Sequence, residues 1–222
     1  MLNLFMPIFH LGVEDIEPNH FVAYVFELPG CFGNGATMDE AIARVPARLA
    51  ARLGVSDPPQ LEVAEVFTSW ISEGDYRVNA FFEADRPPLT AAEVEEGLEL
   101  LNKSRQALMQ VVQKVPKDAF DQQDERAARG SITGTLLHIA NAEAWYFDRL
   151  GLALPREQLP ADPLKRLEAV RAHTLSMLPK LAGDARITER QGEQWSGRKV
   201  LRRTLWHEGD HTNQIAEIIR RD

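Results

Sequence analysis

The residues with the clearest chemical potential are two histidines near the end of the chain, His207 and His211, in the sequence HEGDH. Side chains four positions apart lie on one face of an α-helix, so both imidazoles can reach one metal ion. An imidazole that faces an apolar interior needs a partner for its ring nitrogens, and a metal ion supplies one. On a helical wheel, the residues that share this face are Val200, Thr204, Ile215 and Ile218.

Two histidines seldom complete a functional metal site, so a third ligand is expected from another helix. His138 is the only histidine in the helical pattern of residues 132–150, and it lies on the shoulder of the apolar stripe there. Glu143 lies nearer the centre of the stripe, where a carboxylate must be paired. It is therefore a candidate ligand, orienting group or acid/base group, unless it lies at the surface.

Two other interpretations of the histidines stay open. A single interior histidine is usually a hydrogen-bonded core residue, and we expect His173 to be of that kind or exposed. The letters from His207 to His211 also match HExxH, the motif of zinc proteases. Glycine in the middle of a long helix, and the lack of a strand edge to hold a peptide, disfavour a protease.

The elements that precede these helices indicate a small α+β layer of strands around one helix, over residues 1–88. Aromatic and β-branched residues predict a strand at 20–28, which pairs with 8–16 through a turn at 17–19. A proline-glycine pair ends this strand. The glycine-rich segment 31–37 is expected to be a loop.

A helix is predicted next, because Thr37 and Glu40 form a capping box before an apolar pattern. Pro46 lies inside this pattern, so the helix should be kinked or start late. Two further strands are expected at 62–70 and 76–83, joined by a turn at 72–75.

Asp85-Arg86-Pro87-Pro88 interrupts the strand pattern, so the boundary of an all-α domain is placed there, and this domain covers residues 89–222. Four helices of roughly 20 residues, joined by short loops and one longer connection, predict an up-and-down four-helix bundle. The signals that start these helices are Thr90 with Glu93, Ser131, Asp162 before Pro163, and Ser196.

The charge of the chain limits its partners. A formal net charge of -8 argues against nucleic acid and against anionic membranes. The basic stretch 198–203 (RKVLRR) is the best candidate for a small basic patch, but a solvated helix face with dipole and salt-bridge roles is the favoured interpretation. No stretch is long and apolar enough to cross a membrane, and the start of the chain lacks the basic segment of a signal peptide, so a cytoplasmic protein is expected.

A single cysteine, Cys31, excludes an internal disulfide framework and suits a reducing compartment. No histidine or lysine stands near it in the sequence. A buried or loop thiol is therefore expected rather than a nucleophile.

Residues 89–222 resemble the DinB/YfiT superfamily of metal-binding four-helix bundles. The resemblance is carried by SITGTLLHIANAEAWYFDRL (131–150) and WSGRKVLRRTLWHEGDHTNQIAEII (195–219). That family places one histidine on its second helix and an HxxxH pair on its fourth. The resemblance therefore implies His138, His207 and His211 as the metal ligands.

The first 88 residues resemble the HicB-like fold. The stretch that carries this resemblance is FVAYVFELPGCFGNGATMDEAIARV, from residue 21 to residue 45. HicB proteins often act as antitoxins with a separate DNA-binding segment, which is not evident here. A ligand-sensing or dimerising accessory is therefore favoured over a regulator of a toxin or an operator.

The DinB-like resemblance implies thiol-dependent transferases and isomerases that use small thiols such as bacillithiol or mycothiol. Three imidazoles leave open positions on an ion, where a thiol loses its proton near neutral pH. Glu143 or Glu208 would then move a proton. The ion is expected to be zinc or nickel.

These inferences predict a metal-dependent enzyme, a thiol S-transferase or a hydrolase, whose partners are a small-molecule thiol or an electrophile. Related bundles pair, so a homodimer is also expected. The alternative is a non-catalytic, stress-linked metal-binding protein whose first domain contacts a protein or a ligand. Removal of the metal should separate the two, because only a structural ion is required for folding.

Overall fold

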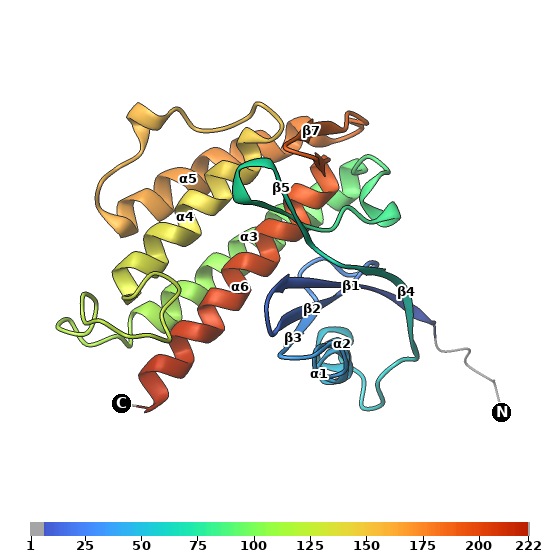
Figure 1. Cartoon of the computed structure of the whole chain (residues 1–222), viewed down its shortest axis with the longest axis horizontal. Helices are drawn as coiled ribbons and strands as arrows, with labels where there is room; N and C mark the ends of the chain where they lie inside the picture. The colour runs from blue at the N-terminus through green and yellow to red at the C-terminus, as the bar shows by residue number, and fades with distance from the viewer. Residues whose placement is uncertain (1–6, 222) are drawn as a thin grey trace. The chain divides into compact units, whose positions relative to one another are not determined.

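A computed structural model describes residues 7–221, and the chain divides into two units (Figure 1). The first, here the strand unit, comprises the chain up to Arg86 together with Glu189–Gln194. The second, here the helical unit, comprises Pro87–Thr188 and the chain from Trp195 onward. The expected order of a strand-rich α/β part and a helical part is confirmed, and a short segment from late in the chain belongs to the first part.

The strand unit is built on a four-stranded sheet with the order β3-β2-β1-β4. β1 pairs with β2 in an antiparallel hairpin, as the sequence predicted, and β4 runs parallel to β1 on the other side. The hairpin turn uses a left-handed residue, Asn19, with φ of 60°. The strands are β1 (Phe9–Glu17), β2 (His20–Val25), β3 (Phe32–Gly35) and β4 (Leu61–Phe67).

The glycine-rich segment 31–37 is not only a loop, because it contains β3, which pairs with β2. The glycines serve close packing. A β-carbon at Gly33 or Gly35 would collide with the backbone of Ala41 in the helix that follows. The prediction of a plain loop was wrong, because these glycines allow a paired strand to pack closely against a helix.

The predicted helix is present as two short helices, α1 (Met38–Ala43) and α2 (Val45–Leu53). Thr37 Oγ1 accepts from the Glu40 amide at 3.2 Å, while the Glu40 carboxylate accepts from the Ala36 amide, one residue before the cap. Pro46 lies in the first turn of α2, where a missing amide hydrogen is tolerated. The expected break at Pro46 is confirmed.

The later strands of the unit differ from prediction. β4 ends at Phe67, and two three-residue strands, β5 (Trp70–Ser72) and β6 (Tyr76–Val78), form a separate sheet around the turn η1 (Glu73–Asp75). A second hairpin, β7 (Thr188–Arg190) with β8 (Glu193–Trp195), was not predicted. Its Glu193 carboxylate accepts a hydrogen bond from the Tyr76 hydroxyl. Strands of three residues carry too little alternation to be recognised.

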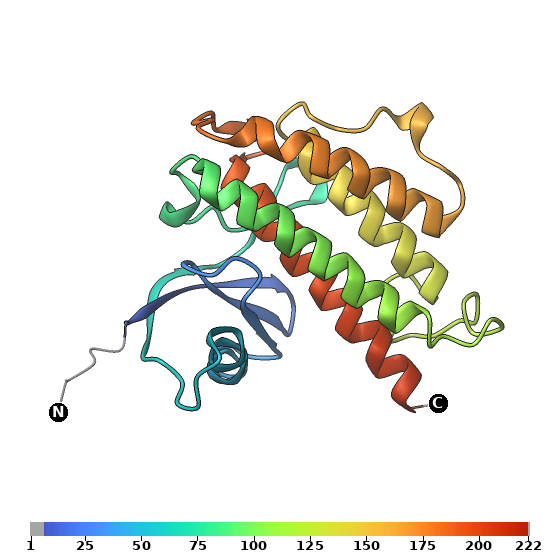
Figure 2. The same cartoon turned by 180° about the vertical axis from the view of Figure 1, so that it is seen from behind.

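Among the described residues, the helical unit contains four long helices, which Figures 1 and 2 show from opposite sides. All four start at the caps that the sequence indicated, with side-chain oxygens of Thr90, Ser131, Asp162 and Ser196 accepting from backbone amides. α4 packs against α5 and α6, and α3 packs against α6. The helices are α3 (Ala91–Val112), α4 (Ile132–Asp148), α5 (Pro163–Met177) and α6 (Gly197–Arg221), and short turns lie at η2 (Glu83–Asp85), η3 (Arg156–Gln158) and η4 (Leu178–Leu181).

Two separate apolar clusters fill the helical unit. One is formed by residues such as Leu101, Tyr146, Leu178 and Leu205, and the other by residues such as Leu108, Ala140, Val170 and Ile215. Along each helix the two clusters are separated by at least one charged residue. The charged residues at these four positions are Arg105, Glu143, Arg171 and Glu208.

The basic stretch 198–203 is not a solvated face. Lys199 is fully buried, and Arg202 and Arg203 are nearly so. The Lys199 ammonium lies 4.3 Å from the ring centre of Trp195, and the Arg203 guanidinium lies 4.4 Å from that of Trp206. The faces of these indole rings therefore pack against the two cations and the methylene groups of their side chains. A charge count along the sequence does not reveal this packing.

Two further expectations concern Cys31 and membranes. Cys31 is buried, and burial raises the pKa of its thiol, as expected for an unreactive cysteine. Among the described residues, no helix has the length and apolar character needed to cross a bilayer. The interpretation of the chain start involves residues 1–6, which lie outside the described part.

Candidate metal centre

α4 and α6 bring together the three histidines that the sequence singled out. His138 Nε2 lies 3.0 Å from His207 Nε2, and His211 Nε2 lies 3.2 Å from the same atom. One nitrogen from each ring can be chosen so that all three lie within 4.8 Å of one another. Within the described residues, this is the group with the geometry to hold a metal ion.

The separations of these nitrogens suit a common ion. Metal–nitrogen bonds of about 2.0–2.1 Å place neighbouring ligands about 3.0 Å apart in an octahedron and about 3.3 Å apart in a tetrahedron. The observed 3.0 and 3.2 Å fall in this range. Without a cation or a proton between them, imidazole lone pairs at such distances would repel each other. The donor set therefore fits a divalent metal ion.

A glutamine orients one of the three rings. His211 Nδ1 lies 3.0 Å from Gln214 Oε1. If this amide is oriented with its oxygen toward the ring, Nδ1 donates, and Nε2 keeps its lone pair for a ligand role. Gln214 thus fixes the tautomer that metal binding requires.

The environment keeps the rings of His138 and His207 neutral. Burial, followed by the charges of His211 and Arg129, lowers the pKa of His138 to about 4. Burial, followed by the charges of His211, His138 and Arg203, lowers the pKa of His207 well below its usual value. Neutral imidazole is the form that binds a metal, so protons compete weakly with the ion at these two residues.

Aromatic rings surround His207. Tyr146 and Trp206 both meet its ring edge to face, with ring centres 5.9 and 5.8 Å away. His207 is only 7% exposed, and His211 is 9% exposed. His138, which the wheel placed on the shoulder of its stripe, is the more accessible of the three. Access to an ion is therefore expected from the side of His138.

Glu143 and Glu208 lie in a buried network with two arginines, which we call the ionic layer (Arg105, Glu143, Arg171 and Glu208). Arg105 binds Glu143 at 2.9 Å and Glu208 at 2.7 Å. Arg171 binds Glu143 at 2.8 Å and Glu208 at 3.0 Å. Each of the four long helices contributes one member, so the layer ties all four together.

The ionic layer changes how the two carboxylates are interpreted. Glu143 is 2% exposed, so the alternative that it lies at the surface is wrong. Burial alone would raise its pKa, but the charges and hydrogen bonds of Arg171 and Arg105 outweigh burial and lower it. A carboxylate with a lowered pKa is a weak base. These contacts favour a positioning role, and proton transfer by Glu143 or Glu208 stays a prediction.

Three contributors were missed from the sequence: Arg105, Arg171 and Gln214. A signal existed for the arginines, because a buried Glu143 required a counter-charge, and helical spacing in α3 and α5 places Arg105 and Arg171 between apolar residues. For Gln214, the signal was its position three residues after His211, within reach along the helix.

His173 is not part of the cluster. Its Nε2 lies 2.8 Å from the carbonyl oxygen of Leu152, so it is a half-buried, hydrogen-bonded histidine, one of the two outcomes expected for it.

The fold and the site together define a class: an α/β chain whose helical part carries three inward-facing histidines on two helices. Comparison with known families supports this assignment. The DinB superfamily matches residues 100–215, just over half of the chain, and the protein belongs to that superfamily. The strand unit lies almost wholly outside the match. No curated protein and no solved structure matches the chain.

We predict that breaking the ionic layer destabilises the protein. Glu143→Gln leaves a buried arginine charge uncompensated, so the free energy of unfolding should fall by about 3–5 kcal/mol. Glu168→Gln, at an exposed position on α5, is the matched control and should change it by less than about 0.5 kcal/mol. Urea denaturation of the metal-free proteins measures both. Equal stability of Glu143→Gln and the control would contradict a structural role for the layer.

A second prediction follows from the lowered pKa of His138. In the unfolded chain this histidine takes up a proton near its usual pKa of 6.5, whereas in the folded chain it stays neutral down to about 4. The unfolded state binds more protons in this window, so the stability of the metal-free protein should fall as pH falls from about 6.5 to about 4. His138→Gln should flatten this dependence in urea denaturation at several pH values. If stability depends on pH in the same way in the wild type and in His138→Gln, the dependence does not come from His138 and the prediction is refuted.

Proposed function

We propose that this protein is a metal-dependent enzyme of the DinB superfamily, acting on a small molecule at the three-histidine site, with a low-molecular-weight thiol as the second substrate. The observation that carries the proposal is the convergence of three imidazole Nε2 atoms at 3.0 and 3.2 Å. His138, His207 and His211 are the proposed ligands. Zinc or nickel is the proposed ion, because both accept imidazole.

The residues of the chain would share the work as follows. The three histidines hold the ion, Gln214 holds His211 in the required tautomer, and the ionic layer keeps α4 and α6 in register. A bound divalent ion would supply Lewis acidity that lowers the pKa of a thiol in an open coordination position. Aromatic rings of Tyr146 and Trp206 would exclude water from the side of His207.

The remaining assignments concern the frame of this site. We propose that the four helices form the up-and-down four-helix bundle of the superfamily, which the packing of α4 on α5 and α6 and of α3 on α6 supports. For the strand unit we propose a HicB-like domain with its boundary at residue 88. A sheet of strand order β3-β2-β1-β4 that packs the helices α1 and α2 supports this. A homodimer and a cytoplasmic location complete the proposal.

One observation favours a second candidate, a non-catalytic metal-binding protein linked to stress. The ligands come from the middle of α4 and α6, so an ion would cross-link two helices and could be structural. The strand unit would then recruit a protein or ligand. The ionic layer already joins the same two helices through Glu143 and Glu208, which is why catalysis is the leading candidate.

Metal content tests the site itself. The purified protein should carry about one divalent ion per chain, and His207→Ala should bind it more than about 100-fold more weakly. Gln214→Leu, which removes only the orienting contact, should weaken binding by about 10–100-fold. His173→Ala is the matched control, because His173 lies outside the cluster, and it should bind like the wild type. Elemental analysis and competition with a chelating dye measure these effects. An unchanged metal content in His207→Ala would end the proposal.

Metal removal and thiol binding together separate the two candidates. For the enzyme we expect the chelated protein to keep its helical circular dichroism, because the apolar clusters and the ionic layer do not need the ion. The cobalt-loaded protein should change its visible spectrum when cysteine or glutathione is added, and His207→Ala should not. Loss of the helical signal on chelation, with a spectrum that thiols leave unchanged, would instead support the structural candidate.

A further inference from the structure

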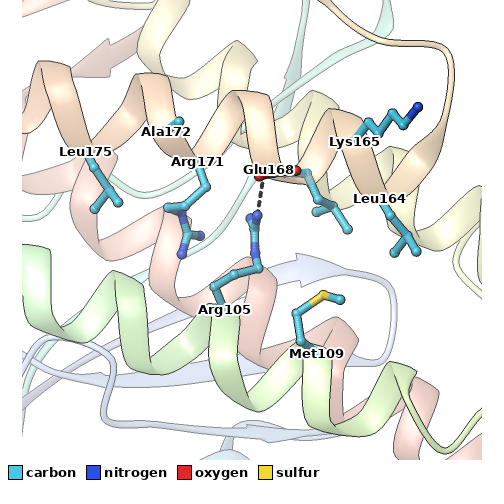
Figure 3. A pocket seen from close by; sticks show the side chains of 9 residues that line it. Arg105, Met109, Leu164, Lys165, Glu168, Arg171, Ala172 and Leu175 are labelled. Carbon is cyan, nitrogen blue, oxygen red and sulfur yellow. Dashed lines mark hydrogen bonds between the residues drawn. The ribbon is translucent and has the colours of Figure 1, made fainter.

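A cavity lies in the helical unit, with none of the three histidines in its lining. Its volume is about 480 Å³, and it opens between α3 and α5 (Figure 3). A cavity of this size lies within the usual range for small-molecule sites.

The walls of the cavity are mainly apolar. Met109 projects from α3 (Figure 3), and α5 contributes Leu164, Leu167, Ala172 and Leu175 to the lining. Leu164 is 39% exposed, which is high for a leucine in a helix of a packed protein and places it at the mouth. These residues offer contact to a hydrocarbon body.

Two arginines of the ionic layer also line the cavity. Figure 3 shows Arg105 reaching from α3 toward α5 and Arg171 reaching from α5 toward α3. Arg105 Nη1 donates to the carbonyl of Leu167, and Arg171 Nη1 donates to the carbonyl of Leu101. Each arginine therefore donates a hydrogen bond to the backbone of the opposite helix, and the two bonds join α3 to α5.

The two arginines offer hydrogen-bond donors to the cavity, while the ionic layer to which they belong has no net charge. Their two positive charges are balanced by Glu143 and Glu208, which they bind directly. Two guanidinium groups carry ten N–H donors, of which seven are used in hydrogen bonds to the described residues. Three N–H donors therefore remain, while the layer as a whole is neutral.

The mouth is also balanced in charge. Lys165 and Glu168, which complete the lining, are both exposed and carry opposite charges. A ligand with a net charge would gain no unopposed partner at the mouth. Deeper in the cavity, its charge would be buried beside a layer whose charges are already matched, which is unfavourable.

We propose that this cavity binds a small uncharged molecule with an apolar chain and one hydrogen-bond acceptor, such as a ketone or an ester. The acceptor takes an N–H of Arg105 or Arg171, and the chain lies against Met109, Leu164 and Leu175. The proposal does not rest on the proposed enzymatic function: the cavity shares no residue with the three-histidine cluster, although Arg105 and Arg171 also belong to the ionic layer.

The experiment uses 2-octanone, octanoate and octylammonium as probes of equal chain length and different charge. The full chain is labelled with ¹³C at the methionine methyl groups, and among the methionines of residues 7–221 it is Met109 that lines the cavity. 2-Octanone should shift the Met109 signal saturably and bind at least about tenfold more tightly than either charged probe. 2-Hexanone should bind about fifteenfold more weakly than 2-octanone, because each buried methylene contributes about fourfold.

A pair of matched variants locates the binding. Ala172→Phe fills the cavity and should abolish the shift, whereas Ala107→Phe, at an exposed position of α3 outside the lining, should leave it unchanged. Circular dichroism checks that both variants are folded. If a variant does not fold, the comparison of the probes on the wild-type protein still tests the proposal. The proposal is overturned if 2-octanone leaves Met109 unshifted, if a charged probe binds as tightly, or if folded Ala172→Phe binds like the wild type.

Discussion

The helical unit depends on one constraint: four charges lie in its centre, three of them buried and that of Arg105 partly buried, and each must meet an opposite charge from another helix. An uncompensated ion in an apolar interior is strongly unfavourable, so few relative placements of the four helices are permitted. Arg105 and Arg171 each meet both Glu143 and Glu208, so all four pairs form together only when all four helices are in place. The apolar clusters on either side supply the driving force for burial but little directional information. The ionic layer therefore selects the register.

That register determines where the histidines meet. His207 is adjacent to Glu208 on α6, and His138 lies five residues before Glu143 on α4, so the contacts that fix the carboxylates also fix the heights of the two rings. A slip of one helical turn, about 5.4 Å, would separate nitrogens that now lie 3.0 Å apart. The same layer has a second consequence on its other side, where the arginines span α3 and α5 and leave a cavity beside them. The candidate centre and the cavity are thus two results of one packing arrangement.

Much of this arrangement was accessible from the sequence. Capping residues are local, so Thr90, Ser131, Asp162 and Ser196 marked the four helix starts correctly. The HxxxH spacing is also local, and it led to the histidine cluster. What failed depended on how side chains pack, which spacing alone does not give. Segment 31–37 contains a strand with close-packed glycines, where only a loop was expected. Lys199 and Arg203 lie over indoles three or four residues away in the sequence, and Arg105 and Arg171 acquire their role only when four helices meet.

The charged layer also bears on why the three histidines are available for chemistry. In a bundle with an entirely apolar core, three adjacent imidazoles would be a defect that only a permanent ion could remove. Here α4 and α6 are already joined through the carboxylates and arginines, and burial holds His138 and His207 in the neutral form. The three rings therefore have the placement that the proposed ligand role needs, without being required to hold the helices together. In the proposed enzyme such a site would exchange its ion and vary its coordination while the surrounding fold stays in place, and this freedom is what a catalytic metal needs and a structural metal does not.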